Sequence, residues 1–278
     1  MHVPNLVVAH TMCNECDGIG VLDKPHCVCG VRCSACNKWD NKKKKFSCEP
    51  CNTCGVREVV CRGPNTANEF GNWLFKAEHS NAVCLAHNAK GYDAYFLLEY
   101  LLNNTVDKIH TLPKVIFAGS KIMSMSVDKF NMKIIDSLNF LGVKLSALPK
   151  MFNLTEMHKG YFCHFFNTEA NADYLGPLPA PKYYGPDQMS TSERAAFYRW
   201  YEERNKTTFY MRYELLAYCR NDVDILLKAS SKFRSLLIEY ARVDPFKQAT
   251  LASTSMAVFR TNFLEERLLI KLKGDDKT

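Results

Sequence analysis

Two short runs of this chain each place a carboxylate beside an amide or a phenol. The first run, Ala-His-Asn-Ala-Lys-Gly-Tyr-Asp, contains Asn88 and ends at Asp93. The second, Tyr-Cys-Arg-Asn-Asp, begins at Tyr218 and ends at Asp222. Enzymes that cut phosphodiester bonds with divalent ions hold those ions between carboxylates and orient a water molecule nearby. The two runs are therefore candidates for one metal-dependent site that acts on a phosphodiester.

Each run also has an ordinary structural interpretation. An aspartate at a helix start, as expected for Asp93, is most often a cap or a partner of the helix dipole. The four-residue spacing places Tyr218 and Asp222 on one face of a helix, and such a pair usually lies on a solvated edge. Each motif alone is weak evidence for a functional site, and only their joint occurrence, order and flanking residues make that function credible.

Hydrophobic periodicity predicts the elements that would position these residues. A buried strand is expected at 82–86 and a helix at 92–102, so that the strand delivers a polar segment to a helix start. We predict further strands at 3–9, 115–118, 121–127 and 130–136, a turn at 128–129, helices at 68–79, 191–203 and 210–240, and a loop at 167–190. A short helix at 145–152 should be interrupted by Pro149. Interleaved strands and helices indicate an α/β fold with a mixed sheet.

Composition is compatible with a folded protein that binds a polyanion. The chain has 278 residues, 47% hydrophobic, with 36 Lys and Arg against 29 Asp and Glu and a net charge of +7. This length and apolar content support a buried core in one or two domains. The basic excess is only a mild preference for nucleic acid. Apolar stretches such as 95–102 fall far short of the roughly 20 residues of a membrane span, so we expect an intracellular protein without a membrane partner.

Cysteines are concentrated near the amino terminus. Ten of the 13 lie within residues 13–61, many as Cys-x-x-Cys pairs, which favours metal-bound thiolates over disulfides. The pairs Cys13/Cys16 and Cys33/Cys36 are separated by sixteen residues, a spacing typical of a four-cysteine Zn²⁺ site. A second site is expected from Cys48, Cys51, Cys54 and Cys61.

The pairing within this block stays open. His26, Cys27 and Cys29 are spare ligands, and the alternative is a set of free thiols in a loosely ordered insertion. We favour zinc because a segment with so few large apolar residues could hardly order itself without metal. The block also carries Lys42, Lys43, Lys44 and Lys45, which are either a solvated run or a phosphate-binding surface.

Taken together, the two runs resemble the second and third exonuclease motifs of family B DNA polymerases, Asn-x(2-3)-Phe/Tyr-Asp and Tyr-x(3)-Asp. The resemblance is to the protein-primed branch found in adenoviruses, linear organellar plasmids and Polinton/Maverick transposons. It implies a ribonuclease H-like exonuclease domain that uses Mg²⁺. It also implies that Asp222 ligates one ion, that Asp93 holds the other through water, that Tyr218 orients the attacking water, and that Asn88 contacts the DNA strand end.

Two smaller matches lie between these motifs. Ser137-Leu138-Asn139-Phe140-Leu141 resembles the Ser/Thr-Leu-x-x-hydrophobic element, which in the family binds single-stranded DNA and the terminal priming protein. Lys159-Gly160-Tyr161-Phe162 resembles the Lys-x-x-hydrophobic element, whose lysine assists phosphate stabilisation. The implied partners are single-stranded DNA or a primer terminus and a priming protein.

The chain departs from the family in two respects. No Asp-x-Glu, the first exonuclease motif, occurs in the 278 residues, and the palm motifs of nucleotide addition are absent. The chain is expected to begin one strand too late and to stop before the palm. The expected organisation is a first remaining strand at 1–12, a cysteine-rich zinc-binding insertion at 13–62, an exonuclease-like domain at 63–242, and the start of a connection toward the palm at 243–278.

Three functional hypotheses follow. The first is a fragment of a protein-primed family B DNA polymerase that covers the proofreading 3′–5′ exonuclease region and is inactive alone. The second is a non-catalytic, zinc-stabilised module that binds DNA or a priming protein. The third is a remnant of a decayed mobile element, against which the presence of Asn88, Asp93, Tyr218 and Asp222 argues.

Overall fold

A four-stranded mixed sheet carries most of the predicted strands. The computed structural model describes residues 3–12, 38–40, 45–47, 57–106, 109–154, 157 and 159–264. Within it, the sheet order is β5-β10-β9-β8. The strands are β5 (Val83–Ala86), β8 (Lys114–Ala118), β9 (Lys121–Val127) and β10 (Met132–Asp136). β10 runs parallel to β5 and antiparallel to β9, which pairs antiparallel with β8, so the prediction of a mixed sheet is confirmed.

The β9–β10 hairpin has the expected turn. A 3₁₀ turn at Asp128–Phe130 joins the strands, and Asn131 adopts the left-handed conformation, with φ of 47°, that asparagine tolerates. Apolar side chains of both strands lie in one buried cluster, including Ile122, Met125 and Met132. Their burial against the helices holds the sheet in register.

A helix packs on this sheet, and a second helix packs on the first. α3 (Asp93–Asn103) buries Leu97, Tyr100 and Leu101 against the sheet, as predicted. α2 (Thr66–Leu74) is shorter than the predicted helix at 68–79, because the chain leaves the helix after Leu74 and forms a separate 3₁₀ turn at Ala77–His79. At Gly71 a Cβ atom would lie 2.4 Å from the Tyr100 ring, so only glycine permits this close approach of α2 to α3.

A second, two-stranded sheet lies apart from the first. β1 (Leu6–Thr11) pairs antiparallel with β4 (Arg57–Arg62), with Leu6 opposite Arg62 and Thr11 opposite Arg57. β1 begins later than the predicted strand at 3–9. Among the described residues, β4 is the only strand paired with β1, and β10 is the only strand paired with β5. Two further antiparallel pairs are β2 (Lys38–Asp40) with β3 (Lys45–Ser47), and β6 (Thr105–Val106) with β7 (Ile109–His110).

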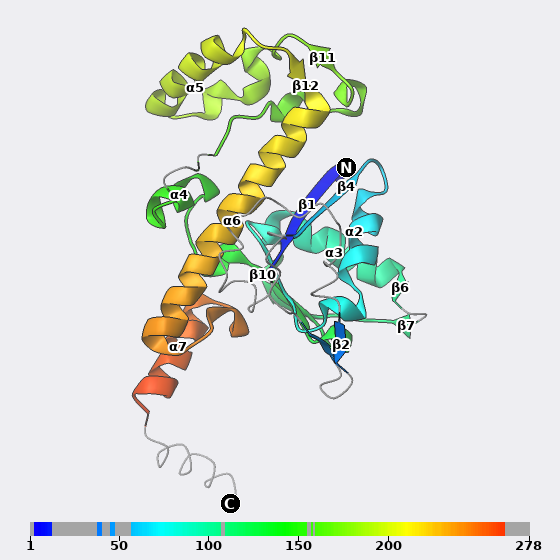
Figure 1. Ribbon diagram of the computed structural model, residues 1–278, viewed down its shortest axis with the longest axis vertical. Coiled ribbons are helices and arrows are strands. Elements are labelled where there is room, and N and C mark those ends of the chain that lie inside the picture. Colours follow the sequence, from blue (N-terminus) through cyan, green and yellow to red (C-terminus); the bar gives the residue numbers. More distant parts are fainter. Residues whose placement is uncertain are drawn as a thin grey trace, which may run out of the picture.

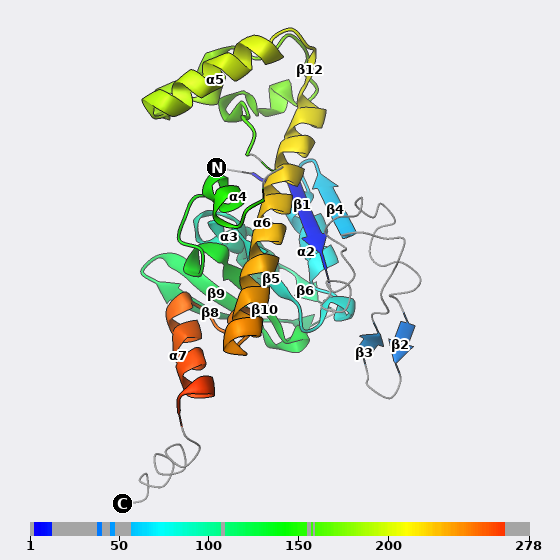
Figure 2. The same ribbon diagram turned by 60° about the vertical axis from the view of Figure 1, so that its left-hand side comes forward.

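One helix runs the length of the molecule. α6 (Met211–Ala241) has 31 residues, about 46 Å at the usual rise per residue. Figure 1 shows α6 running beside the sheets, from the end near α5 (Thr191–Arg204) to the end near α7 (Leu251–Asn262), and Figure 2 shows it passing in front of β5 and β10. Its apolar face packs Ile225 and Ala229 against a cluster that includes Ile135 and Phe140. This packing fixes α6 against the end of β10.

The short helix near Pro149 differs from the prediction. α4 (Leu148–Met151) begins one residue before Pro149, so the proline lies in the first turn, where its missing N–H costs no helical hydrogen bond. Leu148 is fully buried against α6. Proline therefore starts this helix and does not interrupt it.

An aromatic cluster supports the amino-terminal end of α6. α5 begins at a capping box in which the Ser190 hydroxyl accepts from the Glu193 amide, and Phe197 of α5 is completely buried. Phe162, Phe166 and Tyr184 join Phe197 in this core. The predicted loop at 167–190 is confirmed as mostly irregular, with short 3₁₀ turns and a two-residue strand, β11 (Leu175–Gly176), that pairs with β12 (Phe209–Tyr210). Across the described ranges, none of the helices combines the length and apolar character of a membrane span.

Candidate active site

Three of the predicted site residues meet on one side of α6. Tyr218 and Asp222 project from α6, and Lys159 approaches them from the segment that precedes the aromatic cluster. The Lys159 Nζ lies 3.2 Å from Asp222 Oδ2 and 5.4 Å from the centre of the Tyr218 ring. The side chains of Lys159 and Asp222 are only 31% and 21% exposed, so the pair is partly withdrawn from water. The structure therefore brings the lysine element and the second carboxylate run into direct contact.

The environment of this cluster disfavours charge on Asp222. Burial raises the pKa of Asp222 above its ordinary value, although the Lys159 ammonium and the Tyr218 hydroxyl act in the opposite direction. Burial, followed by the Asp222 charge, also raises the pKa of Tyr218. Burial by itself would lower the pKa of Lys159, but the phenol of Tyr218 and the carboxylate of Asp222 outweigh it and raise that pKa. Lys159 therefore remains a cation at neutral pH.

One carboxylate oxygen of Asp222 is unpartnered among the described residues. Oδ2 faces Lys159, whereas Oδ1 is buried and accepts no hydrogen bond from the residues that the structure describes. A buried carboxylate oxygen without a donor is costly unless a ligand satisfies it. Mg²⁺ prefers oxygen ligands of this kind, so the unpartnered oxygen fits a cation at this position.

The first carboxylate run lies where β5 turns into α3. Asn88 adopts the left-handed conformation, with φ of 64°. A 3₁₀ turn at Ala89–Gly91 then leads to Asp93, the first residue of α3. Asp93 has an exposed surface. The surrounding protein nevertheless displaces part of the water around its carboxylate, and this desolvation, together with the negative charge of Asp136, raises the pKa of Asp93. Asp93 thus lies at a helix start, as the sequence predicts, on a turn built from the end of β5.

The Ser137-Leu138 element lies beside this turn. β5 and β10 are parallel, and Ala86 is opposite Asp136 at their carboxyl ends, so both loops leave the same edge of the sheet. His87 Nδ1 and the Ser137 hydroxyl are 2.9 Å apart and link the two loops. The predicted DNA-binding residues Asn88, Ser137 and Leu138 are therefore neighbours.

Sequence reasoning missed two histidines of this region. Burial lowers the pKa of His87, which lies within electrostatic range of Asp136 and also of Lys159 and Asp222 in the α6 cluster. Burial and Lys159 lower the pKa of His164, whose ring lies edge-on to Tyr218 with centres 5.5 Å apart. The sequence offered one indication for His87, which is its position directly before the candidate site residue Asn88. Nothing in the sequence marked His164.

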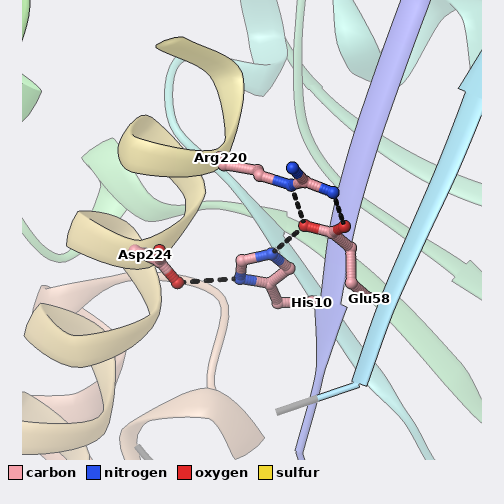
Figure 3. Close-up of polar contacts among 4 residues, drawn as sticks. All are labelled: His10, Glu58, Arg220 and Asp224. Atoms are coloured by element: carbon pink, nitrogen blue, oxygen red, sulfur yellow. Dashed lines mark hydrogen bonds and ion pairs between the residues drawn. The ribbon is translucent and has the colours of Figure 1, made fainter. Parts of the chain in front are cut away.

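A polar network fastens the other side of α6 to the β1–β4 hairpin (Figure 3). Arg220 donates from Nε and Nη2 to the two carboxylate oxygens of Glu58, at 2.7 and 2.5 Å. His10 of β1 lies between Glu58 and Asp224, with ring nitrogens 3.1 and 3.0 Å from their oxygens. The Arg220 hydrogen bonds help to hold the pKa of Glu58 below its ordinary value, although burial acts against them.

This network fixes the rotation of α6. Arg220 and Asp224 are four residues apart and share one helix face, as do Tyr218 and Asp222. A two-residue offset turns the second pair to roughly the opposite side of the helix. Holding Arg220 and Asp224 on the hairpin therefore directs Tyr218 and Asp222 toward Lys159.

The donor set for metal ions is incomplete in the part of the chain that the structure describes. No group of three or more His, Cys, Asp or Glu side chains there is arranged to hold a metal ion. Asp222 offers a free oxygen and Asp93 an exposed carboxylate. The residues fit part of a two-ion site and leave most ligand positions to other groups.

Most of the predicted zinc and lysine residues lie outside the described residues. These are Cys13, Cys16, Cys33, Cys36, Cys48, Cys51, Cys54, Lys42, Lys43 and Lys44. Lys45 is the first residue of β3, and Cys61 is a buried residue of β4, opposite Val7. Burial raises the pKa of the Cys61 thiol. The proposed zinc pairing stays a prediction.

Comparison with known proteins places this site in a sequence family. The model of the family described as DNA polymerase type B, organellar and viral, matches residues 75–278. A "Probable DNA polymerase" of Ascobolus immersus is 25% identical over 204 residues, which cover 69% of this chain and 16% of that protein. Proteins with the same description from Neurospora intermedia and Agaricus bitorquis are 24% and 23% identical, over 68% and 69% of this chain.

The matched relatives are much longer. The chain spans 20% of the Neurospora intermedia protein and 24% of the Agaricus bitorquis protein. No solved structure shows a significant match to this chain. The likeness therefore covers the carboxylate runs, the Ser137 element and Lys159, and only a minor share of each relative.

Proposed function

Because the chain belongs to the type B DNA polymerases of organellar and viral origin, we propose that it provides the proofreading 3′–5′ exonuclease region of a protein-primed DNA polymerase that acts in DNA replication. The contact between Lys159 and Asp222, beside Tyr218, is the observation that carries this proposal. These residues come from separate matched motifs, and the fold joins them in one partly buried cluster. The proposed fold is ribonuclease H-like.

Each residue has a role that its surroundings support. Mg²⁺ bound at the site would activate water and neutralise phosphate charge. Asp222 would hold it through the unpartnered Oδ1, with Asp93 contributing from the start of α3. Tyr218, with its raised pKa, keeps its proton and can orient a water, while Lys159 remains a cation that can stabilise phosphate. Asn88, Ser137 and Leu138 would hold the strand end.

We propose that this set is insufficient for catalysis. Two divalent ions carry four positive charges, and Asp93 and Asp222 supply only two. Asp136 cannot assist, because its oxygens accept backbone N–H groups. An Asp-x-Glu strand would supply two more carboxylates, and the edges of β1 and β5 that face no strand among the described residues could pair with it. Without such a strand the chain should neither extend nor degrade DNA.

The cysteine-rich insertion is proposed as a zinc-stabilised element of the same protein. Its cysteine spacing supports Zn²⁺, and its four successive lysines support contact with phosphate groups. The insertion leaves the fold between β1 and β4, the hairpin that the His10–Glu58–Arg220–Asp224 network fastens to α6.

The second candidate function is a binding module without catalysis. The nearness of Asn88, Ser137 and Leu138, combined with the incomplete carboxylate set, favours binding of single-stranded DNA or a priming protein. Fluorescence anisotropy with a labelled single strand and a matched duplex tests the shared part of both proposals. Preference for the single strand, weakened by Asn88→Ala, is expected. Equal affinity for both DNAs, unchanged in that variant, would contradict the proposal.

A further inference from the structure

Asp136 is a buried carboxylate enclosed by backbone N–H groups. It ends β10, and the residue is 1% exposed. Oδ1 accepts from the amides of Asn88 and Leu138, at 3.0 and 2.8 Å. Oδ2 accepts from the amide of Lys90, at 3.1 Å. Three amides from two loops therefore converge on one side chain.

These bonds determine the path of both loops. Asn88 and Lys90 belong to the turn between β5 and α3, and Leu138 to the turn after β10. Asparagine tolerates the left-handed conformation that Asn88 adopts, and hydrogen bonds on both sides restrain the residue in it. The Asn88 and Lys90 bonds to Asp136 provide that restraint on one side, and Gly91, whose amide donates to the Asn88 carbonyl at 2.8 Å, provides it on the other.

The structure assigns Asp136 as the positioning residue that joins the Asn88 turn and the Ser137-Leu138 turn into one rigid strand-binding edge. The inference rests on the proposed function for what the edge binds, but its geometry is independent of it. Asp136 reaches no substrate, because its oxygens are enclosed by protein amides. It acts through the backbone of the residues proposed to grip DNA and through the turn that leads to Asp93.

A carboxylate is required here because all three partners are donors. An ionised carboxylate accepts on both oxygens, whereas an asparagine has one accepting oxygen and one donating amide nitrogen. In Asp136→Asn, the oxygen can keep the Asn88 and Leu138 bonds, but the amide nitrogen then faces the Lys90 N–H, donor against donor. Asp136→Ala removes all three acceptors. The two variants therefore predict different patterns of loss.

Hydrogen exchange of individual amides, followed by NMR in the full 278-residue chain, tests this pattern. In Asp136→Ala the amides of Asn88, Lys90 and Leu138 should exchange at least about tenfold faster, the equivalent of about 1.4 kcal/mol. In Asp136→Asn only the Lys90 amide should exchange faster to this extent. Amides in the interior of β10, such as Ile134, report global unfolding and should change little in the Asn variant. The control Asp128→Asn alters an exposed carboxylate at the other end of the hairpin and should leave all three amides unchanged.

Single-strand affinity provides the functional readout. The account expects at least about fivefold weaker binding by Asp136→Ala, a smaller loss for Asp136→Asn, and none for Asp128→Asn. Unchanged exchange at all three amides in Asp136→Asn and Asp136→Ala, or unchanged DNA affinity in a variant that has lost them, overturns the assignment. If the unaltered chain binds no single strand, the proposed function fails, and the exchange pattern alone then decides the positioning role.

Discussion

Lys159 and Asp222 form an ion pair in which only one carboxylate oxygen takes part. Nζ lies 3.2 Å from Oδ2, whereas Oδ1 is buried and has no hydrogen-bond partner within the described part of the chain. A pair that served stability alone would be expected to satisfy both oxygens. The half-satisfied carboxylate is what a ligand-binding site requires, because a bound cation would complete it. The unpartnered oxygen therefore opposes stability.

The first prediction is that Asp222→Asn stabilises the fold near neutral pH. Burial raises the pKa of Asp222 above its value in the unfolded chain, so its ionised form is the less favourable one in the folded state. The stabilising contribution of protonated Asp222 is therefore fully present below the pKa of this group in the unfolded chain. It is lost as the pH rises through the higher pKa of the folded state. The advantage of the variant should grow over that window and persist at neutral pH. Urea unfolding at several pH values measures it.

Asp244→Asn is the matched control. The Arg234 hydrogen bonds, at 3.1 and 2.6 Å, hold the pKa of Asp244 below its ordinary value, although burial acts against them. Asp244 therefore stabilises the fold above its unfolded pKa and loses that effect as pH falls. Its replacement should cost about 1–3 kcal/mol at neutral pH. A loss of stability in Asp222→Asn similar to that in the control would contradict the first prediction.

The second prediction concerns the network between α6 and the β1–β4 hairpin. Glu58 is 7% exposed and Arg220 38% exposed at the side chain, so solvent screens part of their attraction. A double-mutant cycle of Glu58→Gln and Arg220→Gln should give a coupling free energy on the order of 1 kcal/mol. Because the network orients α6, the single variants should also change the chemical shifts of Tyr218 and Asp222. Zero coupling with unchanged shifts would show that the network does not orient the helix.

The sequence was most informative where local pattern and local structure agree. Strands β5, β9 and β10 and helices α3 and α6 have strong periodicity, and their packing does not override it. Only the family resemblance predicted that Lys159 and Asp222 belong to one site. The two residues are far apart in sequence, and the intervening segment forms the aromatic cluster around Phe197, whose packing brings them together. Asp136 was missed because it reads as the polar end of a strand; its role depends on three backbone amides that no residue pattern encodes.

The third prediction is that the cysteine-rich insertion binds on the order of two Zn²⁺ ions per chain, because eight cysteines stand at ligand spacing. Elemental analysis of fully reduced protein purified without chelator measures the content. Removal of the metal should also unfold the insertion, since binding free energy contributes to folding in such sites. Less than about half an equivalent would rule out a zinc-stabilised insertion.

The fourth prediction is salt-sensitive binding of single-stranded DNA. Phosphate contacts release counterions, so affinity should fall as salt rises, and replacement of Lys42, Lys43, Lys44 and Lys45 by alanine should reduce the slope. Anisotropy titrations at several salt concentrations measure both effects. Replacement of Lys129 and Lys182, whose ammonium groups lie over the rings of Phe130 and Tyr183, is the control. Affinity that does not depend on salt would count against a phosphate-binding role.

The central claim is that this chain holds part of a proofreading exonuclease site and needs an Asp-x-Glu strand to complete it. The most direct measurement is degradation of a 3′-labelled single strand with Mg²⁺ or Mn²⁺, by the 278-residue chain and by a longer protein in which an Asp-x-Glu strand precedes His2. The account predicts no degradation by the chain alone, and 3′–5′ degradation by the longer protein that Asp222→Ala abolishes. Robust degradation by the chain alone, abolished by Asp222→Ala, would contradict it, as would an inactive longer protein that is correctly folded and binds the strand.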